Sequence, residues 1–321
     1  MKKCCFIIPY FGVLPNYFSV FLKTCEKNQD FEWLIFTDCK IYNEIPSNVK
    51  IIKQSFDEFK MLAEKKLNIN IEIKDFHKLC DFKPAYGLIY EDYIKDYKSW
   101  GHCDIDIVLG NLNKFITDEL IEKYDKIFCL GHMILYKNTY ENNRVFMKKY
   151  NGVELYKKVF SNSKTFIFDE TFGGRNNVNS IFEAYGKKIY TKDLSFNAKI
   201  FPTKFVRTKF DFLKYDFIDE KYKKSIYIWN NGDFYRLYFE GKELRKEEFI
   251  YFHFQQRKMK INDKVLESNY FKIIPNKFDV LETINIDEKN FPKIKKSSFC
   301  MHYFSKHLEW YIKKLKKRCK K

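Results

Sequence analysis

Two aspartates stand in an apolar stretch of the sequence, residues 100–112, which is WGHCDIDIVLGNL. A carboxylate in an apolar interior costs several kcal/mol unless it is paired or binds a metal. Asp104 and Asp106 are two residues apart, so on one strand their side chains would share a face. Two converging carboxylates can hold Mg²⁺ or Mn²⁺, and such an ion can bridge a diphosphate. An exposed edge strand or turn is the alternative, but the apolar flanks favour the metal site.

The elements around this D-x-D motif are expected to form a parallel sheet. Residues 4–12 and 31–39 are apolar runs that indicate strands, and the apolar residues of 15–28 between them are spaced as on a helix. Strand, helix, strand is the start of a nucleotide-binding α/β sheet. Further along we expect a strand in 49–56, helices in 56–67 and around 86–94, and the strand carrying both aspartates in 103–110.

The second half of the chain is less regular. We expect an amphipathic helix in 114–124, a strand in 126–138, helices in 153–162 and 179–186, and a strand in 249–259. Asn231-Gly232 interrupts the alternating residues of 225–239, which predicts a β-hairpin. The clearest shift in composition is a basic tail, residues 296–321.

Composition restricts the class of protein. A chain of 321 residues with 45% hydrophobic and 19% aromatic residues indicates a packed globule rather than a disordered or fibrous protein. The net charge of +17 would attract anionic lipid, phosphorylated ligands or nucleic acid. Zinc-finger spacing and RNA-binding aromatic boxes are absent from the sequence, so we expect no nucleic-acid partner.

The sequence also indicates a compartment. Its 9 cysteines are an odd number without C-x-x-C spacing, which favours free thiols in a reducing environment. The N-terminus does not resemble a secretory signal, and no apolar run approaches the ~18 residues of a membrane span. We expect a cytoplasmic protein, peripheral on the inner face of the plasma membrane.

Four segments together resemble the bacterial GT-A glycosyltransferases of capsule and lipopolysaccharide synthesis: FIIPYFG, FTDC, KLCDFKPAYG and WGHCDIDIVLGNL. The resemblance implies an α/β GT-A fold, a Rossmann-like nucleotide-sugar-binding sheet flanked by helices, with the β-hairpin and a C-terminal basic helix added. It divides one domain, residues 1–295, into a nucleotide-binding half (1–115) and an acceptor-binding half (116–295). The implied cofactors are Mn²⁺ or Mg²⁺, with a UDP-sugar as donor substrate.

The resemblance also assigns donor-binding residues in the first half. The loop where the first strand ends, the usual nucleotide position of such sheets, contains Pro9, Tyr10, Phe11 and Gly12. Asp38 can accept hydrogen bonds from uracil or ribose, or it is a cap or turn residue. Asp81 and Lys83 resemble the Asp and basic residue that contact nucleoside and phosphate; a structural Asp and a solvated Lys are the alternative.

In the second half, FHFQQRKM resembles the H-F-x-x-x-K pattern of glycogenin-like transferases. This implies His253 as a metal ligand with Asp106 and Asp104, the last also a candidate contact to ribose. The usual glycine of the pattern is missing here, so either Arg257 or Lys258 contacts the diphosphate. His102 and His132 flank the predicted site and can also be ordinary loop residues; His77 is expected to be structural.

An inverting transfer needs a carboxylate that takes the proton of the acceptor hydroxyl. Asp169 and Glu170 in IFDETFGG are the candidates, Glu170 being favoured, and helix capping is their alternative role. The sequence therefore predicts a metal-dependent hexosyltransferase. It would move galactose, galactofuranose, glucose or an N-acetylated form from a UDP-sugar to a glycan or lipid-linked acceptor in bacterial surface polysaccharide synthesis.

The basic tail fits this hypothesis as an interfacial helix on the anionic inner membrane surface, where a lipid-linked acceptor would lie. Two other functions remain open at this point. A nucleotidyltransferase would share the sheet and the metal carboxylates, although the loop after the first strand is a poor phosphate loop. A non-catalytic basic protein that binds membrane or nucleic acid would explain the charge but leave Asp104, Asp106 and His253 unexplained.

Overall fold

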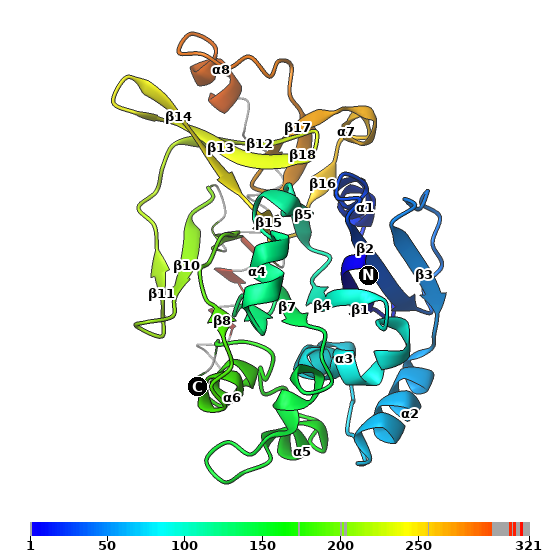
Figure 1. The fold of residues 1–321 in the computed structure, drawn as a ribbon. Coiled ribbons are helices and arrows are strands. Elements are labelled where there is room, and N and C mark those ends of the chain that lie inside the picture. The colour runs from blue at the N-terminus through cyan, green and yellow to red at the C-terminus, as the bar shows by residue number, and fades with distance from the viewer. Residues whose placement is uncertain are drawn as a thin grey trace.

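The largest sheet of the structure, a computed structural model, has the strand order β3-β2-β1-β4-β7-β6-β8 (Figure 1). The structure describes residues 2–172, 174–199, 201, 204–255, 257–296, 308–309, 311–312 and 315–316. The strands of this sheet are β1 (Lys2–Pro9), β2 (Phe31–Thr37), β3 (Val49–Lys53), β4 (Tyr97–Cys103), β6 (Lys126–Ile127), β7 (Met133–Lys137) and β8 (Ile189–Tyr190). Strands β3, β2, β1 and β4 run parallel, the order that begins a doubly wound nucleotide-binding sheet.

Strand β1 is buried on both faces, as expected of a central parallel strand. Its alternate residues enter different cores: Cys5 and Ile7 belong to one, Phe6 and Ile8 to the other. Segments contributing to the first core include α2 (Phe56–Leu67), η1 (Phe76–Ala85), α3 (Tyr86–Ile89), η4 (Asn142–Met147), α5 (Leu155–Phe160) and α6 (Val178–Ala184). Those of the second core include α1 (Phe18–Glu26), η3 (Leu112–Lys114) and α4 (Asp118–Lys123).

A second sheet, in the order β11-β10-β9-β15-β5, brings distant segments together. Its strands are β5 (Ile107–Leu109), β9 (Phe196–Ala198), β10 (Arg207–Asp211), β11 (Asp216–Asp219) and β15 (Tyr251–His253). Strand β5 follows β4 directly in the chain but pairs antiparallel with β15. The chain therefore passes from the first sheet to the second at the D-x-D motif.

The third sheet, in the order β14-β13-β12-β17-β18-β16, lies at the top of the view in Figure 1. It contains β12 (Ser225–Asn230), β13 (Asp233–Glu240), β14 (Glu243–Phe249), β16 (Lys260–Ile261), β17 (Tyr270–Ile274) and β18 (Lys277–Val280), with α7 (Lys264–Glu267) and α8 (Phe291–Lys296) nearby. The predicted hairpin is confirmed as β12–β13. Its turn residues Asn231 and Gly232 have φ of 44° and 100°, the left-handed pair that a type I′ turn needs.

The predicted α/β class, a Rossmann-like sheet flanked by helices with a β-hairpin, is confirmed. Several predicted elements are wrong in detail because tertiary pairing overrides the local pattern. Residues 103–110 form the end of β4 and then β5, and 126–138 form β6 and β7 around a loop. Within 249–259, Phe249 ends β14 and 251–253 form the separate strand β15. The helix expected around 86–94 ends at Ile89 and is followed by the 3₁₀ turn η2 (Glu91–Tyr93).

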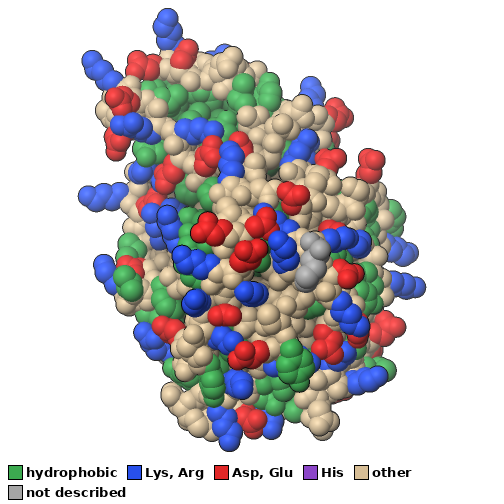
Figure 2. Space-filling model, viewed as in Figure 1, with side chains coloured by type: hydrophobic (Ala, Val, Ile, Leu, Met, Phe, Trp, Pro, Cys, Tyr) green, Lys and Arg blue, Asp and Glu red, His purple; other side chains and the backbone are tan. Residues whose placement is uncertain are grey.

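The distribution of charged side chains on the surface bears on the partners suggested by the net charge of +17. Figure 2 shows a face on which Lys and Arg are scattered among Asp and Glu rather than gathered in one basic patch. Among the described residues, no helix has the length and apolar character to cross a membrane. Most of the predicted basic tail lies outside the described residues. The cysteines within them, Cys4, Cys5, Cys25, Cys39, Cys80, Cys103 and Cys129, are free thiols.

Candidate functional site

The D-x-D motif lies at the break between β4 and β5, not inside one strand as predicted. The Asp104 backbone N–H donates to the His132 carbonyl at 3.1 Å, and the Asp106 carbonyl accepts from the Phe254 N–H at 3.2 Å. Each aspartate is thus held by a different sheet. The Asp104 side chain is 32% exposed and that of Asp106 is 21% exposed. The motif therefore places both carboxylates at the carboxyl end of β4 without burying them in an apolar core.

His253 meets Asp106 because β15 pairs with β5, which sets His253 opposite Ile107. Its Nε2 atom is 3.4 Å from Asp106 Oδ1. Its Nδ1 atom is 3.0 Å from Asn197 Oδ1, an oxygen that also accepts a hydrogen bond from Gln255 Nε2. The Asn197 oxygen therefore accepts a hydrogen bond from the Nδ1–H of His253, and Nε2 is directed at Asp106.

These groups fit a divalent cation. One ligand atom each from Asp104, Asp106 and His253 lies within 4.8 Å of the other two. Two neighbouring ligands about 2.1 Å from an octahedral ion lie about 3 Å apart, which is close to the separation of His253 and Asp106. Burial lowers the pKa of His253, but the carboxylates of Asp106, Asp104 and Glu170 together outweigh burial and raise it. The site thus has an imidazole held in the tautomer that metal binding requires, and two carboxylates that attract a cation.

Lys83 joins this site to a second pair of carboxylates. Its Nζ donates to Asp104 Oδ1 at 2.7 Å and to the Gly131 carbonyl at 2.8 Å, and lies 3.4 Å from Asp169 Oδ2. Burial disfavours the charged form, but Asp104 and Asp169 outweigh it and hold the pKa of Lys83 well above its usual value. In the structure Lys83 bridges Asp104 and Asp169, and its predicted contact with the diphosphate stays a prediction.

Asp169 and Glu170 approach the loop between β6 and β7 at Gly131. The Gly131 N–H donates to Glu170 Oε2 at 2.9 Å. A Cβ atom at position 131 would lie 2.4 Å from Asp169 Oδ2, so the close approach needs glycine. Burial raises the pKa of Asp169 to about 7 against the opposing charge of Lys83. Burial also raises the pKa of Glu170 above its usual range, although the Gly131 N–H stabilises the carboxylate.

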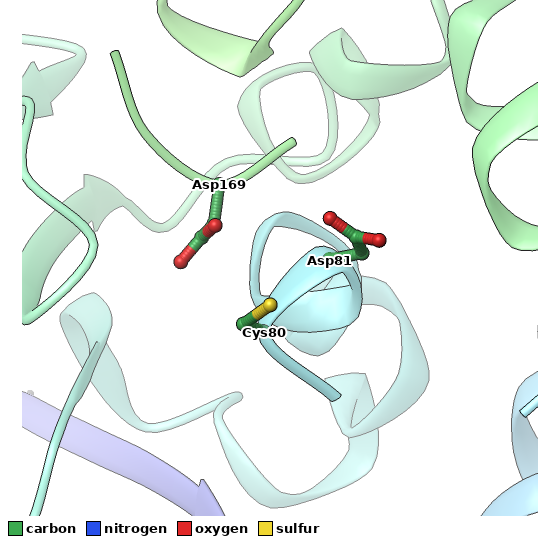
Figure 3. A group of neighbouring side chains, drawn as sticks. All are labelled: Cys80, Asp81 and Asp169. Carbon is green, nitrogen blue, oxygen red and sulfur yellow. The ribbon is translucent and has the colours of Figure 1, made fainter. Parts of the chain in front are cut away.

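Asp81 is buried and bonded to other parts of the protein, which argues against its predicted contact with the nucleoside or phosphate. The residue is completely buried, and Lys78 Nζ donates to its Oδ2 at 2.7 Å. The backbone N–H groups of Phe166 and Phe168 donate to its two oxygens at 2.9 Å each. Figure 3 shows Asp81 and Cys80 on η1, beside the segment that carries Asp169. These three side chains are close enough to share a cation, but Lys78 and the two N–H groups already satisfy Asp81. The bonds from Phe166 and Phe168 to Asp81 therefore fix the segment that carries Asp169.

A cleft of about 840 Å³ opens beside Asp106. Three of the predicted donor-binding residues line it: half-buried Tyr10, buried Arg257 and exposed Lys258. His77, expected to be structural, is exposed and lines the cleft as well. The remaining lining residues are Pro15, Asn16, Tyr17, Gln255, Met259 and Lys260. A metal site at the wall of a cleft with cationic side chains is suited to an anionic ligand.

The loop after β1 is only partly available to such a ligand. Pro9 is buried at the end of β1, and Phe11 is 3% exposed and packs on Phe59, so neither side chain can make its predicted contact. Gly12 is exposed with φ of +96°, and its N–H donates to Asp38 Oδ1 at 3.4 Å. Asp38 is exposed at the carboxyl end of β2 and holds the loop. Gly12, Asp38 and Tyr10 keep their predicted place at the strand ends.

The choice between Arg257 and Lys258 has a structural basis. Arg257 is 8% exposed, and its guanidinium donates to the carbonyls of Lys199 at 2.6 Å and Phe201 at 2.8 Å. These bonds tie the segment after β15 to the segment after β9. The Arg257 guanidinium therefore serves the fold, whereas Lys258, like Lys260, is exposed at the cleft.

Two residues of the site, Asn197 and Gly131, were not predicted from the sequence to be functional, and a third, His132, was left open as an ordinary loop residue. Asn197 orients His253, and Gly131 admits the two carboxylates. His132 is 5% exposed, its Nδ1 lies 2.5 Å from the Tyr251 hydroxyl, and its ring lies tilted at 32° against that of His253 with centroids 4.4 Å apart. Burial lowers the pKa of His132 well below its usual value. A neutral ring packed on His253 restricts the orientation of the His253 imidazole.

Asn197→Ala is expected to weaken manganese binding by roughly 10- to 100-fold, as the loss of a partner to a metal-binding histidine does elsewhere. The physical reason is that His253 loses the acceptor that fixes its tautomer. Calorimetric titration with Mn²⁺ measures the change. Asn197→Asp, which keeps an acceptor oxygen, is the matched control and should retain most of the affinity. Equal affinities for wild type and Asn197→Ala would contradict this positioning role.

Comparison with known proteins places the chain in a family. No curated protein matches its sequence. Among solved structures, it is similar to the galactosyltransferase LgtC, whose crystal structure holds donor and acceptor sugar analogues. The TM-score is 0.34 and the identity 10%, over 60% of this chain and 75% of that one. The model of a family of unknown function, DUF6625, matches residues 6–282, and the chain therefore belongs to that family.

Proposed function

We propose that the protein is a metal-dependent glycosyltransferase of GT-A type that uses a nucleoside diphosphate sugar, with UDP as the nucleotide. The observation that carries the proposal is the convergence of Asp104, Asp106 and His253 at the wall of a cleft lined by Lys258. The two aspartates come from the nucleotide-binding half (1–115) and His253 from the acceptor-binding half (116–295), so one ion would join both halves of a single domain.

The donor is proposed to lie along the cleft. Tyr10 and Asp38, at the carboxyl ends of β1 and β2, would contact the nucleoside, where open α/β sheets bind nucleotides. Lys258 would contact the diphosphate. Asp104, Asp106 and His253 would hold a divalent cation, which would neutralise charge on the diphosphate as it leaves. Lys83 bridges Asp104 and Asp169, so it would tie the metal-binding carboxylate to the residue next to the proposed base Glu170.

Glu170 is the proposed base of an inverting transfer. The acceptor hydroxyl oxygen would attack the anomeric carbon of the donor sugar while the bond from that carbon to the diphosphate oxygen breaks. The hydroxyl proton would pass to Glu170, whose carboxylate is half-buried and hydrogen-bonded to Gly131 N–H. Asp169 is only 3% exposed and lies against Lys83, which makes it the less accessible of the pair.

The experiment that tests the proposal is calorimetric titration of the protein with UDP, with and without Mn²⁺, followed by a panel of UDP-hexoses assayed for hydrolysis and transfer. Galactose, galactofuranose, glucose and their N-acetylated forms are the sugars to offer. Binding of UDP that requires the metal, with release of UDP from one donor, is the expected result. Metal-dependent release of pyrophosphate from a nucleoside triphosphate would instead identify a nucleotidyltransferase, and the absence of metal-dependent nucleotide binding would refute both.

Lys258→Ala and Arg257→Met should affect different properties, UDP affinity in the first case and fold stability in the second. Loss of a charge-assisted bond from Lys258 to the diphosphate should weaken UDP binding by roughly tenfold or more, with unchanged thermal stability. Arg257→Met removes a buried donor from the carbonyls of Lys199 and Phe201 and should lower the free energy of unfolding by about 1–3 kcal/mol. Calorimetry and chemical denaturation measure the two effects. A loss of UDP affinity confined to the Arg257 variant would reverse the assignment.

The acceptor is proposed to be a glycan or lipid-linked oligosaccharide of bacterial surface polysaccharide, reached at the inner membrane surface. The described part of the tail gives limited support. Leu308, Tyr311, Ile312 and Leu315 follow the i, i+3, i+4, i+7 spacing of one helical face and are 63%, 52%, 43% and 51% exposed. An exposed apolar stripe next to clustered Lys residues in the sequence is the pattern of an interfacial helix.

A further inference from the structure

An aromatic surface lies directly beyond Glu170. Exposure alternates along the segment: Asp169 and Thr171 are 3% and 2% exposed, whereas Glu170 is half-buried and Phe172 is 56% exposed. Glu170 and Phe172 are therefore the residues of this segment that face solvent. Phe172 is one of several exposed aromatic side chains among the described residues, and it lies two residues from the candidate catalytic carboxylate.

The hairpin β10–β11 packs against the Phe172 ring. Phe172 packs edge-on against Phe217 of β11, with ring centroids 5.8 Å apart and an interplanar angle of 66°. Phe217 in turn contacts Phe210, its partner across the hairpin, at 5.0 Å. Tyr215 accepts a hydrogen bond from Asn177 Nδ2 at 2.8 Å and donates to the Gly174 carbonyl at 2.9 Å, which ties the hairpin to the loop after Phe172. Phe172, Tyr215 and Phe217 are called the aromatic shelf below.

The shelf and the metal site are built on one sheet. His253 pairs with Asn197, Asn197 with Thr208, and Thr208 with Asp219 of β11, which is two residues from Phe217. Three strand spacings separate β15 from β11, about 14 Å across the sheet. Figure 1 shows the hairpin β10–β11 at the left edge of the molecule, near α6. The sheet thus holds the shelf at a fixed distance from the metal-binding histidine, on the side where Glu170 lies.

We propose that the aromatic shelf is the acceptor subsite, and that a sugar ring of the acceptor stacks its apolar face on Phe172. This inference rests on the proposed function, because a hydroxyl that gives its proton to Glu170 must belong to a ring placed beside it. The rim of the shelf carries groups that can bind ring hydroxyls. The Arg175 guanidinium carbon lies 4.2 Å from the centre of the Tyr215 ring, and Asp216 is exposed at the start of β11. Apolar support with polar groups at its edge is the usual composition of a small-ligand site.

The proposal specifies the class of acceptor. A stacking platform with one cation and one carboxylate at its rim fits a pyranose or furanose ring with free hydroxyls. The lipid part of a lipid-linked acceptor would lie beyond the shelf and is not needed for binding there. Simple glycosides are therefore sufficient probes.

The test is to measure binding of methyl glycosides of galactose, glucose, N-acetylglucosamine and N-acetylgalactosamine by NMR titration, in the presence of UDP and Mg²⁺. We expect at least one glycoside to bind wild type. Phe172→Ala should weaken that binding about tenfold, while affinity for UDP and Mg²⁺ is unchanged. Phe172→Tyr keeps the ring and should bind as wild type does. Tyr140→Ala is the matched control, because Tyr140 is also an exposed aromatic, at 77%, and packs on Arg144.

Two results would overturn the subsite. One is equal glycoside affinity of wild type and Phe172→Ala; the other is binding of UDP and Mg²⁺ by wild type with none of the glycosides bound. Failure of wild type to bind UDP with Mg²⁺ is a separate outcome, because it refutes the proposed function and with it the acceptor assignment. Thermal unfolding of each variant shows whether the fold is retained.

Discussion

Replacing Asp106 with alanine is expected to abolish metal-dependent binding of UDP. Asp106 is the residue whose carboxylate lies nearest the His253 imidazole, 3.4 Å from Nε2, and it borders the cleft. Without it a cation would keep only Asp104 and His253, and Lys83 already binds one oxygen of Asp104. Loss of a partner in the outer shell costs metal sites roughly 10- to 100-fold, so loss of a direct ligand should cost more than about 100-fold.

Calorimetry with Mn²⁺ and UDP measures this loss, and Asp106→Asn separates charge from shape, because the amide keeps the size of the side chain. Both variants should fold, since Asp106 is held through its backbone carbonyl by Phe254. Asp118→Asn is the matched control, a carboxylate of α4 that pairs with Lys98. Manganese-dependent UDP affinity that survives in Asp106→Ala would remove the D-x-D motif from the site, and with it the main support for the proposed function.

The group formed by Asp104, Asp106 and His253 was partly predictable because carboxylate and imidazole side chains are characteristic metal ligands. Two carboxylates in an apolar run indicated Asp104 and Asp106, and a resemblance indicated His253. Their meeting depends on the pairing of β5 with β15, a contact between segments far apart in the sequence that no local pattern specifies. The strand expected through the motif is broken for the same reason, since β5 leaves the first sheet to join that pair.

Residues that act through others were harder to predict. Asn197 and Gly131 have no reactive side chain, and their roles appear only when His253, Asp169 and Glu170 are placed around them. Conversely, Asp81 and Arg257 have charged side chains, but these form hydrogen bonds with backbone atoms of the protein. A charged side chain in a motif indicates that it needs a partner; whether that partner is a ligand or the fold itself depends on burial, which is set by tertiary structure.

The second large effect expected concerns the two adjacent carboxylates. Glu170→Gln keeps the size of the side chain and an oxygen that can accept from Gly131 N–H, but removes its basicity. Binding of UDP and metal should persist, whereas transfer at saturating donor should fall by roughly 10²- to 10⁴-fold, the contribution of general-base catalysis. Asp169→Asn should have a milder effect, because Asp169 is buried against Lys83 and serves to hold that lysine.

The pH dependence of transfer distinguishes the two carboxylates in a second way. Burial raises the pKa of Asp169 to about 7, so Asp169 gains its charge only as the pH rises through that value. If Asp169 were the base, wild-type transfer would fall steadily below pH 7, and Asp169→Asn would be the inactive variant. With Glu170 as base, Asp169→Asn retains transfer, and the rate loss of Glu170→Gln is largest above the raised pKa of Glu170 and shrinks as the pH falls through it, because a protonated Glu170 cannot accept a proton. Near-normal transfer by both variants would exclude an inverting base at this position and favour a retaining mechanism, in which the departing diphosphate and not a protein carboxylate takes the acceptor proton.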